Sequence, residues 1–200
     1  MLYIMSSQNI DTRKKILQVA AKLLVENKGS GVRMSDIAEA ASLSRQAIYL
    51  HFATRAELLE ATTKYLDEIF QIDKRLAPSR AAKTGVERLE RYIDAWGHYI
   101  PEIYGVAHAL MSVKDTDDAA AAAWNDRMYA MRDGCRAAVE ALANDGKLNP
   151  ALAQDDAIDL LWTLLSVRNW ENLTLECGWS HQKYIDTITL SAKQILVPAG

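Results

Sequence analysis

The chain has few of the residues that mark disulfide-rich, membrane-spanning or disordered proteins. Its 200 residues include two cysteines, four prolines and nine glycines. Two cysteines without a Cys-x-x-Cys spacing exclude a disulfide scaffold and disfavour a zinc or redox centre. No apolar run reaches the roughly 18 to 20 residues that a membrane helix needs. Half of the residues are hydrophobic, which is enough to build a core, so disorder is excluded as well.

An excess of positive charge is also lacking, since the formal net charge is -3. This balance argues against a protein that coats nucleic acid or anionic membrane with its whole surface, but it permits a local basic patch. The first ten residues, MLYIMSSQNI, lack the basic region and long apolar stretch of a signal peptide. We expect residues 1–10 to be a flexible leader, with Met1 or Met5 as the native start, and the protein to be cytoplasmic.

Helix-favouring residues dominate, and no segment alternates as a strand does, so we expect an all-α fold of about nine helices. Asp11 is expected to cap a first helix that stops in the segment 27–31. Thr54 is expected to cap a fourth helix that runs to about Leu76. Later helices are expected over 86–100 up to Pro101, which should start a new helix or kink the old one. Further helices are expected from Asp117 or Asp118 to the turn at 144–146, over 155–176, and over 180–196.

The most informative pattern lies between the first helix and the helix that Thr54 is expected to cap. Two short helices are expected there, over 35–41 and 44–52. Only Ser42 and Leu43 separate them, so the chain must turn a sharp corner. The apolar residues of each helix fall on one face, and small residues permit a close crossing at a large angle. The other face of the second helix then points outward, as a recognition helix does. The inward set is Ile37, Ala38, Ala41, Ile48 and Phe52, and the outward set is Arg45, Gln46 and Tyr49.

The outward residues carry the chemistry that reads DNA. Arginine can hydrogen-bond guanine in two places, glutamine can do so with adenine, and an alanine methyl can contact thymine. Residues 1–60 hold eight basic against six acidic side chains, whereas the rest of the chain is acidic overall, so the positive charge lies where a duplex would bind. We expect DNA contacts from Arg33, Ser35, Ser44, Arg45, Gln46, Ala47, Tyr49, His51 and Arg55.

The segment DIAEAASLSRQAIYLHFATRAELL resembles the N-terminal domain of the TetR family of bacterial transcriptional repressors. The resemblance implies a helix-turn-helix domain over residues 11–58 and a helical ligand-binding and dimerisation domain over 59–200. It places Arg45, Gln46 and Ala47 where the family reads bases, and Tyr49, His51 and Arg55 where it contacts phosphates. Ser42 stands where the family usually has a turn glycine that tolerates positive φ, so we expect a strained left-handed backbone at Ser42. Arg55 stands where the family usually has lysine.

The body of such a repressor should hold a pocket for an apolar or aromatic ligand. Aromatic, histidine and methionine side chains at helical spacing are its candidates, although the same pattern also fits plain core. The candidates are Trp96, Tyr99, Tyr104, His108, Met111, Trp124, Met128, Met131 and Trp162, with His98 and Trp170 as weaker ones. Because no third ligand accompanies His98 and His108, we expect no metal site, and no cofactor.

The last two helices are apolar on broad faces, which fits a buried core or, by resemblance, the four-helix interface of a homodimer. The residues assigned to that interface are Leu161, Leu165, Trp170, Tyr184, Ile188 and Ile195.

The sequence therefore predicts a sequence-specific DNA-binding regulator: a dimeric repressor that a small-molecule inducer releases from a near-palindromic operator, with the fourth helix as the moving part. An activating or ligand-independent regulator of the same fold is the alternative. An enzyme is not expected, because no nucleophile–base pair, metal spacing or phosphate loop occurs.

Overall fold

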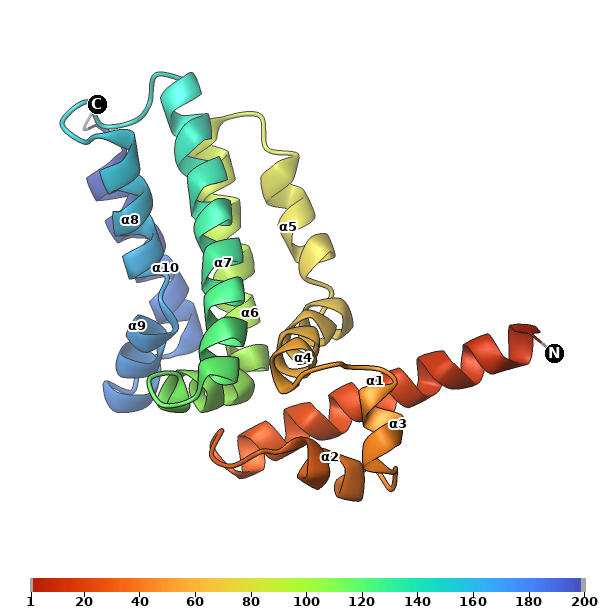
Figure 1. Ribbon diagram of the computed structural model, residues 1–200. Helices are drawn as coiled ribbons and strands as arrows, with labels where there is room; N and C mark the ends of the chain where they lie inside the picture. The colour runs from red at the N-terminus through yellow and green to blue at the C-terminus, as the bar shows by residue number, and fades with distance from the viewer. Residues whose placement is uncertain (1, 199–200) are drawn as a thin grey trace. The chain divides into compact units, whose positions relative to one another are not determined.

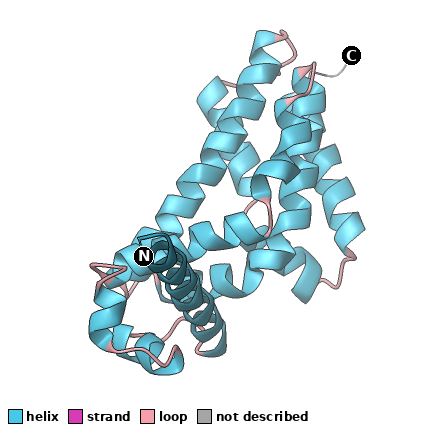
Figure 2. Ribbon diagram, turned by 90° about the vertical axis from the view of Figure 1, so that its right-hand side faces the viewer, coloured by secondary structure: helices cyan, strands magenta, loops and turns pink. Residues whose placement is uncertain are grey.

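The computed structural model describes the backbone of residues 2–198 and the side chains of residues 11–198. Every regular element in that part of the chain is helical (Figure 2), which confirms the all-α fold. The helices are α1 (Leu2–Glu26), α2 (Met34–Ala40), α3 (Arg45–Tyr49), α4 (Arg55–Ile69), α5 (Ile72–Arg80), α6 (Gly85–Val113), α7 (Asp118–Asn144), α8 (Gln154–Leu164), α9 (Val167–Glu171), the π-helical turn η1 (Asn172–Glu176) and α10 (His181–Leu196). The α-helices are labelled in Figure 1.

Three of the predicted helix starts are confirmed by side-chain caps. The Thr54 hydroxyl accepts a hydrogen bond from the Glu57 amide at 3.1 Å, at the start of α4. Asp117 Oδ1 accepts from the amides of Ala119 and Ala120 at 3.1 Å each, at the start of α7. The Ser180 hydroxyl accepts from the Lys183 amide at 3.3 Å, at the start of α10. These caps satisfy backbone amides that have no partner inside the helix.

The start of α1 differs from the expectation. Its backbone is helical from Leu2, so Asp11 lies inside the helix and is not its cap. The flexibility of the leader over residues 1–10 stays a prediction.

Two predicted helices are wrong in their bounds because each is broken in two. The helix that begins after Thr54 ends at Ile69, since Gln71 adopts a left-handed backbone with φ 55°, and α5 then continues past Pro78. The helix expected over 155–176 ends at Leu164, and the Ser166 hydroxyl caps α9 by accepting from the Asn169 amide at 3.2 Å. Pro101, in contrast, lies inside α6 without ending it.

The chain forms two compact units, each of which we describe by itself. Unit 1 holds the residues up to Ile69 together with 103–127, and unit 2 holds 70–102 together with the residues from Met128 onward. Unit 1 thus joins the expected DNA-binding segment to the last part of α6 and the first part of α7. The domain boundary at residue 58 stays a prediction.

The core of unit 1 is built where α1 packs on α4 and α2, and where α2 packs on α3 (Figure 1). Its fully buried side chains include Ile16, Leu24, Ile37, Ile48, Phe52, Leu58 and Leu59. Gly29, in the turn after α1, has φ +78° and lies directly against the backbone of Ala109 in α6. A side chain there would collide with that backbone, so a glycine is required at this contact.

The core of unit 2 includes the contact between α8 and α10. Across unit 2, the Trp96 indole donates a hydrogen bond to the Leu165 carbonyl at 2.7 Å, and the Tyr92 hydroxyl donates to the Met131 carbonyl at 2.8 Å. Both bonds are buried, so they fix α6 against the elements that follow it in unit 2.

Candidate nucleic-acid interface

The corner between α2 and α3 has the geometry of a helix-turn-helix. Ser42 takes a left-handed backbone with φ 55°, which confirms the prediction made from its place in the turn. The turn is closed by the Ser42 amide, which donates to the Glu39 carbonyl, and by the Leu43 amide, which donates to the Ala38 carbonyl, each at 2.9 Å. This pair of bonds ends α2 and redirects the chain into α3.

Helix α3 presents its polar face to solvent, because its apolar face is anchored. Ile48 is fully buried, whereas Arg45, Gln46 and Tyr49 are exposed. The Ser44 hydroxyl accepts a hydrogen bond from the Ala47 amide at 3.1 Å and so caps the helix. The face that the sequence assigned to base reading is therefore accessible, and Ser44 has a structural role besides any contact with phosphate.

Three further residues assigned to DNA contacts are exposed or half-buried. Arg33 is exposed, and its amide donates to the Asp36 carboxylate at 2.9 Å, which fixes the start of α2. Ser35 is half-buried, and its hydroxyl lies 3.3 Å from Asp36 Oδ1. His51 is half-buried, with its ring 6.4 Å from that of Phe52. Their contacts with DNA stay predictions.

Arg55 is the exception among the residues assigned to phosphate contacts. Its guanidinium donates to the Val32 carbonyl at 2.5 Å and to Asp117 Oδ1 at 2.7 Å. The two charged side chains are only 22% and 23% exposed. The Arg55 hydrogen bond holds the pKa of Asp117 below its usual value. Arg55 is thus occupied within the protein.

Two residues near α3 were missed by the sequence analysis. Leu50 follows α3 and is 82% exposed, an unusual position for a leucine. The buried positions 48 and 52 on either side of it were the available signal, since they leave position 50 on the outer face. Arg13 of α1 places its guanidinium carbon 4.9 Å from the centre of the Phe52 ring, a cation–π contact.

The residues assigned to a ligand pocket are divided between the two units. Tyr104, His108, Met111 and Trp124 are half-buried in unit 1, and the rings of Tyr104 and His108 are 5.5 Å apart. In unit 2, Trp96, Tyr99 and Met131 are buried, whereas Met128 and Trp162 are half-buried. A pocket formed by these residues stays a prediction.

The first turn of α10 carries two polar atoms that lack a hydrogen-bond partner among the described residues. They are the hydroxyl of Tyr184, whose side chain is fully buried, and Nε2 of His181. Burial raises the pKa of Tyr184, and burial together with the nearby His98 lowers the pKa of His181. Such atoms are costly unless water or a ligand pairs with them.

Most of the residues assigned to the dimer interface are buried within their own protomer, and their part in a dimer stays a prediction. Leu161, Leu165 and Tyr184 are fully buried within one protomer, Ile188 and Trp170 are nearly so, and Ile195 is half-buried. Periodicity finds the apolar face of a helix, but it does not say whether its own chain already covers that face. The accessible leucines of the two helices are Leu160, 37% exposed on α8, and Leu190, 56% exposed on α10.

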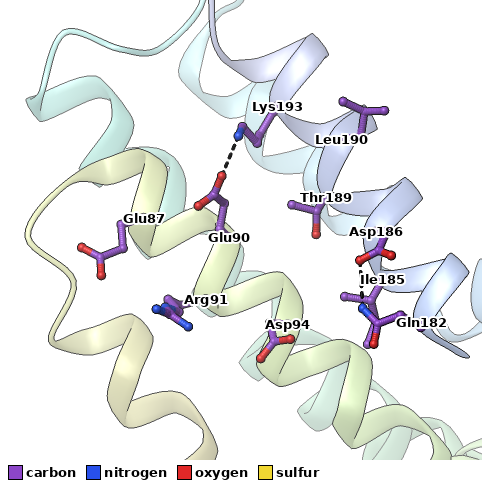
Figure 3. Close-up of a pocket in the computed structure, with 10 residues that line it drawn as sticks. All are labelled: Glu87, Glu90, Arg91, Asp94, Gln182, Ile185, Asp186, Thr189, Leu190 and Lys193. Carbon is purple, nitrogen blue, oxygen red and sulfur yellow. Dashed lines mark hydrogen bonds and ion pairs between the residues drawn. The ribbon is translucent and has the colours of Figure 1, made fainter.

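A groove of about 510 Å³ lies between α6 and α10 (Figure 3). Its lining is charged: Glu87, Glu90, Arg91 and Asp94 come from α6, and Gln182, Ile185, Asp186, Thr189, Leu190 and Lys193 from α10. Lys193 crosses it to pair with Glu90 at 2.6 Å. None of the predicted ligand residues lines this groove, and its composition differs from the apolar pocket that the sequence predicts.

Two kinds of feature are absent from the described residues. No helix among them is long and apolar enough to cross a membrane. No cluster of three or more histidine, cysteine, aspartate or glutamate side chains in the same part of the chain could hold a metal ion.

Comparison with known proteins places the helix-turn-helix in a family. Residues 16–62 match the family described as bacterial regulatory proteins, tetR family. The HTH-type transcriptional regulator CymR of Pseudomonas putida is 30% identical over 185 residues, which cover 87% of this chain and 83% of CymR.

Solved structures of low sequence identity share the fold. NalD of Pseudomonas aeruginosa, the secondary repressor of the MexAB-OprM multidrug efflux pump, has a TM-score of 0.72 at 19% identity, over 95% of this chain and 98% of its own. A transcriptional regulator from Saccharomonospora viridis in complex with choline has a TM-score of 0.72 at 18% identity, over 94% and 99% of the two chains. The CymR match over most of both lengths, together with the family match at residues 16–62, establishes that the chain belongs to the TetR family of DNA-binding transcriptional regulators.

Proposed function

We propose that this regulator is a homodimeric repressor that a small-molecule inducer releases from a near-palindromic operator. The observation that carries the proposal is the outward face of α3, where Arg45, Gln46 and Tyr49 are exposed while Ile48 is buried. In this proposal, regulation depends on binding and not on catalysis, and the protein works in the cytoplasm, where a bacterial chromosome lies. NalD, which shares the fold, is described as a repressor, and this supports repression over activation.

The small size of α3 supports a dimer. A helix of five residues reaches only a few base pairs, so a dimer that places two such helices about 35 Å apart gains the specificity that one lacks. We place its interface on the exposed sides of α8 and α10, around Leu160 and Leu190, because exposed apolar side chains of this size favour contact with a partner.

The inducer is proposed to be a mostly apolar or aromatic molecule with one polar group. Two features of unit 2 support this chemistry. One is the buried aromatic pair Trp96 and Tyr99, with ring centres 5.8 Å apart. The other is the polar atoms of Tyr184 and His181 that have no hydrogen-bond partner among the described residues. A polar group on the ligand would relieve the cost of those atoms. The choline complex of a protein with the same fold supports a small molecule as the ligand.

The proposal is tested by screening small molecules for those that raise the melting temperature of the purified protein. An inducer should raise it and also weaken operator binding about 5- to 150-fold, the usual range of allosteric coupling. Tyr184→Phe should reduce the affinity for that molecule while it leaves operator affinity unchanged. Stabilising molecules that all leave operator affinity unchanged would contradict induction and favour the ligand-independent alternative.

A further inference from the structure

Arg55 joins three segments of unit 1 through one guanidinium. Its own backbone begins α4, Nε binds the carbonyl of Val32 just before α2, and Nη1 binds Asp117 just before α7. Val32 is buried, so its carbonyl belongs to a fixed part of the turn between α1 and α2. The guanidinium therefore holds the entry to α2, which leads into the recognition helix, against the entry to α7.

Asp117 is as fully engaged as Arg55. The same oxygen that accepts from Arg55 also accepts from the amides of Ala119 and Ala120. A carboxylate at a helix N-terminus is stabilised by the helix dipole and by those amides, so the position of Asp117 is set by α7 itself. The bridge thus connects the DNA-binding segment to a helix that continues into unit 2.

A phosphate contact by Arg55 would require an exposed guanidinium whose positive charge is not already neutralised. A guanidinium that is already neutralised by Asp117 adds no net charge to the surface, so it would displace few counterions from DNA. Only a fifth of its side chain is exposed. Arg33, by comparison, is exposed, and no ion pair of its guanidinium is found among the described residues.

We propose that Arg55 is a positioning residue, which supports DNA binding by fixing the start of α2 through Val32 and Asp117, and not by contacting a phosphate. The inference rests on the DNA-binding function of the family. Its consequence is that Asp117, an acidic residue that DNA would repel, is needed for tight operator binding.

The test is a double-mutant cycle with Arg55→Gln and Asp117→Asn, with operator affinity measured across about 50 to 200 mM salt. Asparagine caps helices about as well as aspartate, so Asp117→Asn removes the charge and keeps the cap of α7. Each single variant should weaken operator binding about five- to tenfold, the double variant should be no weaker than either single one, and none should change the salt slope. Arg33→Gln is the matched control and should lower the slope by about 0.9, the share of one phosphate.

Three results of the same measurements would contradict the positioning role of Arg55. The inference is overturned if Arg55→Gln lowers the salt slope as Arg33→Gln does, if Asp117→Asn leaves affinity unchanged or raises it, or if the two losses add. Unfolding curves of each variant show whether the protein is still folded. The Arg55→Lys variant retains the positive charge, so a loss of operator affinity in this folded variant reflects a loss of the fixed position of α2. If the wild-type protein bound no duplex at all, DNA binding itself would fail and this inference with it.

Discussion

Ser42 holds a backbone conformation that serine adopts only with strain. Its φ of 55° lies in the left-handed region, which costs a residue with a Cβ about 1 kcal/mol or more and costs glycine nothing. Ser42→Gly should therefore raise the free energy of unfolding by about 1 kcal/mol, less the extra freedom that glycine gives the unfolded chain. Thermal or denaturant unfolding measures this change.

Ser30→Gly provides the control, because Ser30 is exposed and is not among the described residues with positive φ. That variant should be neutral or slightly destabilising. Equal effects at both positions would show that the strain at Ser42 is negligible.

At the residue scale, the sequence predicts what local pattern determines. The exposed face of α3 follows from the spacing of Ile48 and Phe52, which lie within a few residues of the side chains they orient. The partner of Arg55 does not follow, since Asp117 is 62 residues away in the chain. The burial of Leu161 and Tyr184 within their own chain does not follow either, because burial depends on which distant segment covers a face.

The turn between α1 and α2 can lie against α6 because residue 29 is a glycine and has no side chain. Gly29 and Gly31 both have positive φ, +78° and +71°. A Cβ at Gly29 would collide with the carbonyl oxygen of Ala109 in α6, whereas a Cβ at Gly31 would meet nothing within 4 Å. Gly31→Ala should destabilise the protein by about 1 kcal/mol through backbone strain alone. Gly29→Ala adds a collision with backbone and should cost about 1 to 3 kcal/mol more.

Denaturant unfolding of the two variants, compared with the wild type, measures the difference. Operator affinity should also fall for Gly29→Ala, because the turn leads directly into α2. Equal losses of stability for the two variants would show that the backbone of α6 shifts to accept the added methyl group without lowering the free energy of unfolding.

At the element scale, capping residues predict helix starts better than periodicity predicts helix ends. Thr54, Asp117 and Ser180 each have a side chain that accepts from an amide of the helix they precede, and all three starts are confirmed. The breaks at Gln71 and Ser166 were missed. In the segment that contains Ser166, apolar residues continue at helical spacing, so periodicity gave no sign of a break there.

At the scale of the whole molecule, the proposed dimer makes a prediction about exposed leucines. Leu190→Arg or Leu160→Arg places a charge in the proposed interface and should shift the protein toward monomers in sedimentation. Leu175→Arg is the matched control, because Leu175 is 54% exposed, like Leu190, but lies in η1. A dimer that survives both substitutions on α8 and α10 would place the interface elsewhere.

The family, and with it the general activity, was predictable from the 24-residue segment around α3, whereas the ligand was not. A recognition helix is a local pattern with a fixed chemistry. A ligand pocket combines side chains from distant helices, and the residues proposed for it here come from both units.

The most direct test of the central claim is a selection of bound fragments from random duplex DNA, made in parallel with the wild-type protein and with Arg45→Ala. We expect the wild type to recover a near-palindromic motif with two half-sites about one helical turn apart, and Arg45→Ala to relax the preference at the same base of both half-sites. No enrichment by the wild type, or the same motif at the same affinity with Arg45→Ala, would contradict the role of α3 as the recognition helix.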